Sequence, residues 1–328
     1  MHISLSLVFI IVFVCLAIHS SFKSARIKKM VINEKVSKEF EDKAYELLIH
    51  NPSVSIARFK YKLLGIIEFG LFIAMIAFFG LCFIESSKLY MYLGIISLLS
   101  LIIAVILRKS NALFKEIVPK IISSYKEGLT YEHDKGIPSN EYAAARFERW
   151  DSYHSEDLIK GKINGCDFIM GEVHTQARNT DSDGNTYYAT IFRGTFAVID
   201  LNKDFGSWMN IVSEGIKLFS RDNYVALENT EFEKIYDVFA EDKIKALRLL
   251  TPDVTTKMID LYDETGLMCE IKISNNKMYI RLYTSGLFEL GFSNPRKEAK
   301  GIGRCIAVID NVFKVTENFI SELERLDD

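Results

Sequence analysis

Apolar residues gather in three long runs before residue 109 and alternate with polar residues after it. The runs are Ile3–Ile18, Leu63–Ile84 and Leu89–Leu107, and the last of them contains no charge. About 20 apolar residues in a helix cross the hydrocarbon core of a bilayer. The pattern therefore predicts about three transmembrane helices, the last two of which form a hairpin at residues 63–107.

Basic residues flank the outer ends of these runs: Lys23, Arg26, Lys28 and Lys29 after the first, Arg58, Lys60 and Lys62 before the second, and Arg108 and Lys109 after the third. Lys and Arg concentrate in cytoplasmic loops. We therefore expect a multi-pass protein of the cell membrane, with residues 1–22 as an N-terminal anchor and the C-terminal domain in the cytoplasm. A cleaved signal peptide is the alternative for residues 1–20, but it would carry Lys or Arg before the apolar stretch.

Glu68 interrupts the second run. An acidic residue within a span is a functional candidate because burying its charge in lipid is costly. Glu68 also lies within two turns of the expected cytoplasmic end, where its side chain reaches the interface or Lys60 or Lys62. We favour this structural role for the membrane-embedded acid.

Residues 23–62 separate the first run from the hairpin. Within them, residues 31–49 place apolar side chains near helical spacing, with Glu and Lys on the other face. This pattern predicts an amphipathic helix at the cytoplasmic surface. Its mixed charge favours packing on protein over binding to lipid.

Residues 108–328 have the pattern of a soluble α+β domain. Helices are expected at 111–127, 139–147, 242–250, 253–263 and 305–326, and strands at 166–178, 187–201, 208–212, 224–227, 234–239, 268–273 and 278–283. Asp183-Gly184 between the first two strands is a strong hairpin signal. Because hairpins rather than regular crossovers link the strands, we predict an antiparallel sheet with flanking helices and a long C-terminal helix.

The charge also divides the chain. Residues 1–109 carry 13 Lys and Arg against 7 Asp and Glu, a net charge of +6, whereas residues 110–328 carry 27 against 36, a net charge of −9. A basic, apolar part joined to an acidic, polar part is typical of a membrane anchor that carries a soluble domain. The chain as a whole is nearly neutral, so nucleic acid is not an expected partner.

No catalytic array is recognisable, so catalytic residues stay unknown and neither a cofactor nor a metal is expected. The five cysteines lack paired spacing, which favours free thiols. The stretch from Asn179 resembles the start of a calcium loop, but its twelfth position is Thr190 instead of Glu, so we interpret it as a hairpin turn. The glycines of Gly301–Arg304 are interpreted as a loop.

Arg193 and Gly194 are the candidate binding residues. Arg193 interrupts an apolar strand, and Gly194 allows another backbone or a ligand to approach closely. A guanidinium suits recognition of a carboxylate or phosphate. The alternative is an arginine on the solvent face of the strand, paired with one of the many acidic residues.

Four stretches carry a resemblance through their order and spacing: Ile191–Val198, Leu227–Lys234, Tyr236–Phe239 and Leu249–Pro252. Together they resemble a bacterial family of uncharacterised membrane proteins with a domain of unknown function, in which an apolar hairpin precedes a soluble domain with F-R-G-x-F and L-L-T-P motifs. The resemblance covers about residues 60–325. It implies a membrane location and a bacterial source, but no activity and no catalytic residues.

Two hypotheses for the function follow. The preferred one is a non-enzymatic, membrane-anchored binding or scaffold module, whose partners are the lipid bilayer and either a protein partner or a second copy of the chain. The alternative is a membrane-bound enzyme of the hydrolase type, which requires a deep cleft with convergent titratable groups in the cytoplasmic domain. Transport is a weaker idea, because three spans are few for a pore.

Overall fold

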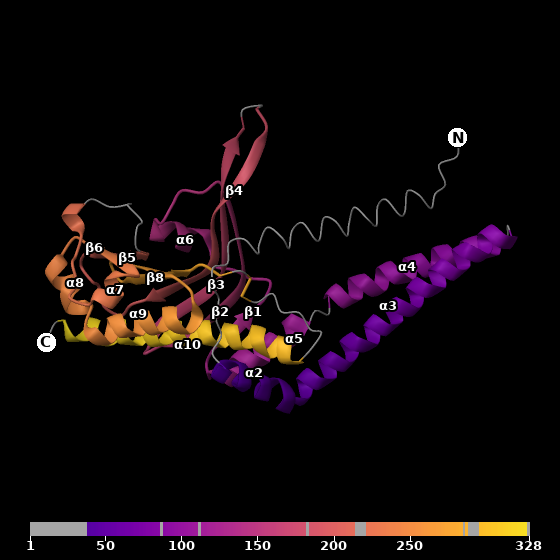
Figure 1. Cartoon of the computed structure of the whole chain (residues 1–328), viewed down its shortest axis with the longest axis horizontal. Helices are drawn as coiled ribbons and strands as arrows, with labels where there is room; N and C mark the ends of the chain where they lie inside the picture. The colour runs from indigo at the N-terminus through magenta and orange to yellow at the C-terminus, as the bar shows by residue number, and fades with distance from the viewer. Residues whose placement is uncertain are drawn as a thin grey trace.

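The computed structural model describes residues 38–85, 88–110, 113–181, 184–213, 221–284, 286–287 and 295–326. The first expected span, in residues 1–22, lies outside the described residues. Two long helices project from a body made of one sheet and its covering helices (Figure 1).

The described chain begins with four helices, α2 (Lys38–His50), α3 (Pro52–Glu85), α4 (Lys88–Ser110) and α5 (Leu113–Tyr125). Asn51 separates the first two, and its side-chain oxygen accepts the N–H of Ser53 at 3.1 Å. This bond and the proline at the first helical position fix the start of α3. The apolar run from residue 63 is therefore part of a longer helix that begins at Pro52.

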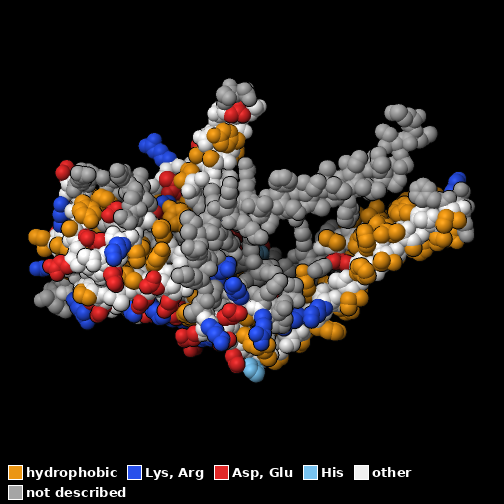
Figure 2. All heavy atoms as spheres, viewed as in Figure 1, with side chains coloured by type: hydrophobic (Ala, Val, Ile, Leu, Met, Phe, Trp, Pro, Cys, Tyr) orange, Lys and Arg blue, Asp and Glu red, His pale blue; other side chains and the backbone are white. Residues whose placement is uncertain are grey.

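Helices α3 and α4 are long and apolar enough to cross a membrane. Their candidate spans are Pro52–Cys82, with a mean hydropathy of 2.3, and Lys88–Val105, with a mean hydropathy of 2.0. None of the most apolar window of α3 is buried, and 22% of that of α4 is buried. Apolar side chains cover both helices (Figure 2). Such exposed apolar surface is unlike the core helix of a soluble protein, so the chain has two candidate membrane helices.

Eight strands form one antiparallel sheet in the order β1-β2-β3-β4-β8-β7-β5-β6. They are β1 (Thr130–Glu132), β2 (Ser152–Ile163), β3 (Cys166–Thr180), β4 (Thr186–Asp200), β5 (Trp208–Ser213), β6 (Tyr236–Ala240), β7 (Cys269–Ser274) and β8 (Lys277–Leu282). The expected α+β class and antiparallel sheet are confirmed. The expected strand at 224–227 is wrong, because Tyr224 forms only an isolated bridge to Phe239.

Helices cover both faces of the sheet. The remaining helical elements are η1 (Arg221–Asn223), α6 (Ser139–Ala145), α7 (Thr230–Glu233), α8 (Lys243–Leu249), α9 (Pro252–Thr265) and α10 (Pro295–Arg325). On the main face, the ring of Phe313 in α10 meets that of Phe168 in β3 at 5.1 Å. On the opposite face, Tyr142 of α6 packs edge-on against Phe196 at 4.7 Å between ring centroids. The sheet therefore separates a large core under α10 from a small core under α6.

Helix α10 extends further than expected. It begins at Pro295 instead of residue 305 and runs through the glycines that were interpreted as a loop, so that interpretation is wrong. A Cβ atom on Gly303 would lie 2.9 Å from the backbone oxygen of Phe40 in α2. The glycine is needed because α2 and α10 cross closely at this point. The contact attaches the N-terminal helices to the body of the domain.

Candidate functional site

Arg193 lies in a row of basic and titratable side chains across three strands. It stands opposite His174 of β3, which stands opposite His154 of β2. Arg193 and His174 are half-buried, and His154 is exposed. Since residues of one strand alternate between faces, His174 shares the α10 face of the sheet with Phe168. The row lies beyond the apolar core, along the strands.

The imidazole of His174 is fixed within this row. Its Nε2 atom lies 2.9 Å from the hydroxyl of Thr190. Burial lowers the pKa of His174, and the neighbouring charges of Arg193 and His154 lower it further. The neutral imidazole is therefore favoured near pH 7.

Gly194 allows a close approach by the protein's own backbone. A Cβ atom at this position would lie 2.0 Å from the carbonyl oxygen of Leu282 and 2.9 Å from the amide nitrogen of Thr284. Both atoms belong to the end of β8 and the residues that follow it. The sequence left open whether another backbone or a ligand approaches Gly194, and in this structure the close contact is with backbone.

Three carboxylates come together next to the row, which sequence reasoning missed. Glu156, Asp157 and Glu172 offer oxygens within 4.8 Å of one another. Glu156 of β2 stands directly opposite Glu172 of β3. Asp157 has a φ of 60° where the register of β2 and β3 shifts. The polar sequence of β2 gave no strand pattern, so nothing indicated that these acids would meet.

Asp157 is buried and hydrogen-bonded to two side chains from β1 and the turn after it. Its Oδ1 atom accepts the hydroxyl of Tyr131 and lies 2.6 Å from His133 Nδ1. Burial raises the pKa of Asp157, while the hydrogen bonds from Tyr131 and His133 lower it. A carboxylate beside an imidazole can transfer a proton, and three carboxylates present the oxygen ligands that hard cations prefer.

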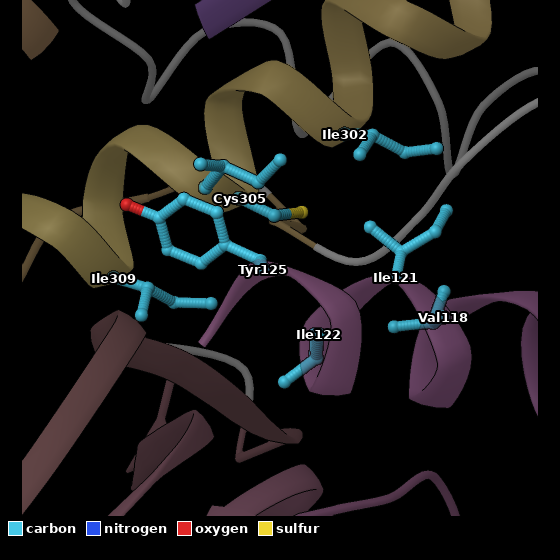
Figure 3. Close-up of a pocket in the computed structure, with 8 residues that line it drawn as sticks. Val118, Ile121, Ile122, Tyr125, Ile302, Cys305 and Ile309 are labelled. Atoms are coloured by element: carbon cyan, nitrogen blue, oxygen red, sulfur yellow. The ribbon is translucent and has the colours of Figure 1, made fainter. Parts of the chain in front are cut away.

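A small pocket lies between α5 and α10 (Figure 3). It is a shallow hollow with room for about one water-sized group, and it is lined by Val118, Ile121, Ile122, Tyr125, Ile302, Cys305, Ile306 and Ile309. The hydroxyl of Tyr125 is bonded to Asp310 at 2.5 Å. Burial raises the pKa of the Cys305 thiol well above its usual value. The lining is therefore apolar and unsuited to acid–base chemistry.

Glu68 is not brought together with Arg193 and Gly194. It is half-buried in α3, which projects away from the sheet (Figure 1). The sequence-derived candidates therefore lie in separate parts of the molecule.

The hairpin of β3 and β4 projects beyond the rest of the sheet (Figure 1). β2 pairs with β3 only as far as Gln176, and the pairing of β8 with β4 begins at Thr195. Beyond these points the hairpin is a two-stranded ribbon, here called the ribbon, made of Ala177–Thr180 and Thr186–Phe192. Tyr187 and Tyr188 are 51% and 52% exposed on it.

Residues 190–320 match the family model described as Protein of unknown function (DUF3137). This match runs from β4 to α10 and confirms the resemblance to a domain of unknown function for that part of the chain. The membrane hairpin, which the resemblance also included, lies outside the matched residues. No curated protein matches the chain.

Among solved structures, the chain is similar to the crystal structure of the mycobacterial trehalose monomycolate transport factor A, TtfA. The sequences are 10% identical, and the TM-score is 0.31 over 60% of this chain and 94% of that chain. At so low a score, no conclusion about fold or function follows from the likeness.

Proposed function

We propose that the chain is a membrane-anchored, non-enzymatic binding module whose ribbon binds a protein partner. The observation that carries the proposal is the ribbon itself, which presents two exposed tyrosines away from the body of the domain. Tyrosine is enriched at protein interfaces, where its ring is buried and its hydroxyl finds a partner. A two-stranded ribbon on its own is only marginally stable in water, so contact with a partner would also stabilise it.

The anchor in this proposal is the α3–α4 hairpin in the cell membrane, with the sheet domain in the cytoplasm. Support comes from the exposed Lys60 and Lys62 at the start of α3 and from the basic residues after α4. A cysteine at Lys60 is expected to react with a membrane-impermeant maleimide only in opened cells. A cysteine at Ser87, between the two helices, is expected to react in intact cells, and the reverse pattern would contradict this orientation.

Two contacts join this anchor to the domain. Arg58 of α3 donates to Glu298 of α10, and Gly303 lets α2 pack closely on α10. A firmly held domain keeps its binding surface in one orientation relative to the bilayer. This arrangement suits a module that presents a surface at a fixed place.

Photocrosslinking in intact membranes tests the proposal. A photoreactive phenylalanine at Tyr188 is expected to give a protein adduct of defined mass, which disappears when Tyr187 is also changed to Glu. The matched control is the same group at Tyr92, an exposed tyrosine of α4, which is expected to react with lipid. The absence of a protein adduct at Tyr188 would overturn the proposal.

A hydrolase-type enzyme is the second candidate, because Asp157, one of the three clustered carboxylates, is buried beside the imidazole of His133. This function predicts hydrolysis of simple phosphate or carboxylate esters by the purified protein, with Mg²⁺ or Mn²⁺ added. Glu172→Gln would abolish that activity, whereas the exposed Glu228→Gln would not. Equal rates for the two variants would remove this candidate.

A further inference from the structure

We propose that the partner of the ribbon is a second copy of this chain, which pairs antiparallel with the outer edge of β4 over Thr186–Phe192. The inference rests on the proposed function, since it names the partner that the ribbon binds.

The outer edge of β4 is the edge that faces away from β3. β3 pairs with one edge of β4 from Thr186 onward, and β8 pairs with the other edge from Thr195. Among the described residues, no strand pairs with that other edge before Thr195. The backbone N–H and C=O groups on such an edge form a template for a further strand.

The sequence of this edge suits pairing with itself. Thr186–Phe192 reads T-Y-Y-A-T-I-F, which is rich in β-branched and aromatic residues and has no charged side chain. A two-fold axis perpendicular to the sheet would place two identical edges antiparallel to each other. Like charges directly opposite one another would destabilise such a pair, and this segment contains none.

The outer edge of β3 is less suited to the same role. The N–H of Asp151 donates to the backbone oxygen of Gln176 at 2.9 Å, and the N–H of Arg178 donates to Asp151 Oδ2 at 2.7 Å. These bonds occupy the part of the β3 edge that is nearest to β2. Arg178 would also meet its own copy there with a like charge. The geometry therefore favours the β4 edge.

Attachment to a membrane makes a small contact sufficient. Stable interfaces between soluble proteins bury about 800 Å² on each partner, and seven paired residues bury less. Two copies anchored in one bilayer meet at a high effective concentration, which strengthens a weak contact without any new atoms in it. A short strand pair is therefore enough for association within the membrane.

Cysteine crosslinking of the full chain in membranes tests the inference. In a Cys15→Ser, Cys82→Ser background, which keeps the buried Cys166, Cys269 and Cys305, one cysteine is added at each of residues 186–191 in turn and treated with a short bismaleimide. Self-adducts are expected to peak at one position of β4 and to decline on both sides. The reason is that the distance between a residue and its own copy grows as the residue lies further from the two-fold axis. The matched control is Asn179→Cys, which lies opposite Tyr187 on β3 and is expected to give at least 10-fold less adduct.

Two lysine variants distinguish pairing through the outer edge of β4 from pairing through the outer edge of β3. Ala189 and Ala177 stand opposite each other in the ribbon, so lysine at either position affects the hairpin similarly. Ala189→Lys is expected to remove the self-adduct, because two lysines would meet near the axis, whereas Ala177→Lys is expected to leave it. Equal effects of the two variants, or a peak on β3, would overturn the inference.

The outcomes also separate this inference from the proposed function. Adducts with another protein at residues 186–191, without a self-adduct, would overturn the second copy but retain the binding module. The absence of any protein adduct, in this scan and at Tyr188 in the photocrosslinking, would overturn both.

Discussion

The guanidinium of Arg58 in α3 donates a hydrogen bond to the carboxylate of Glu298 in α10, across 240 residues of sequence. The side chains are 16% and 1% exposed, so the ion pair is largely out of water. It joins the first candidate membrane helix to the helix that covers the main core. Loss of one partner of a buried pair costs about 3–5 kcal/mol, because the other charge stays buried without its partner.

Arg58→Met is therefore expected to lower the melting temperature of the detergent-solubilised protein by about 10 °C, on the usual scaling for a domain of this size. Arg58→Met combined with Glu298→Leu is expected to recover most of this loss, because no charge is then left buried. Lys62→Met, at an exposed position of the same helix, serves as the control. A double variant as unstable as Arg58→Met would contradict this account of the pair.

Arg281 predicts a second large effect, on the face of the sheet that α6 covers. Its guanidinium donates to Glu270 and, at 2.5 Å, to Glu148, and it lies 4.4 Å from the centre of the Phe147 ring. Arg281→Met would leave Glu270 and Glu148 buried without their cationic partner. It is expected to cost about 3–5 kcal/mol, measured by urea unfolding, while Arg248→Met, at an exposed position, is expected to change little. Similar unfolding midpoints for the two variants would show that the buried network contributes little.

The elements that were predicted correctly are those whose own sequence determines them. Apolar length alone indicates α3 and α4, and the alternation on both sides of Asp183-Gly184 indicates the β3–β4 hairpin. β2 was missed because many of its side chains, including those of His154 and Glu156, are polar and do not alternate with apolar ones. Its strand state depends on pairing with β3, which local sequence does not reveal.

The candidate site shows the same limit. Arg193 could be picked out because it interrupts an apolar strand, and its role in binding stays a prediction. The meeting of Glu156 with Glu172 depends on the register between two strands, and a shift of one residue would move these side chains to opposite faces. The start of α10 was placed too late because Gly303 suggested a loop, whereas its lack of a side chain serves the contact with α2.

Gly194→Ala tests whether this glycine serves the fold or a ligand. The added methyl group would lie 2.0 Å from the carbonyl oxygen of Leu282, a backbone atom that cannot move without separating β4 from β8. We expect a loss of about 2–3 kcal/mol in the free energy of unfolding, the upper part of the range for overpacked sites. Gly171→Ala is the matched control, because its nearest backbone oxygen is 3.1 Å away and a small shift relieves the contact. Equal stability of the two variants would mean that the close approach at Gly194 is not needed for folding.

The row of His154, His174 and Arg193 predicts a pH dependence. Burial, and then the charges of Arg193 and His154, lower the pKa of His174 in the folded protein. The unfolded chain, with a histidine pKa of about 6.5, then binds more protons than the folded one between these two pKa values. Stability from this group is thus present above about pH 6.5 and is lost as the pH falls through the lower, folded pKa.

Melting temperatures measured from pH 8 to pH 5 test this dependence. His174→Asn is expected to flatten the decline of the melting temperature, and Arg193→Met is expected to flatten it in part. His50→Asn, whose side chain is 76% exposed, is expected to leave it unchanged. A decline in His174→Asn as steep as in the unmodified protein would show that other groups cause the acid sensitivity.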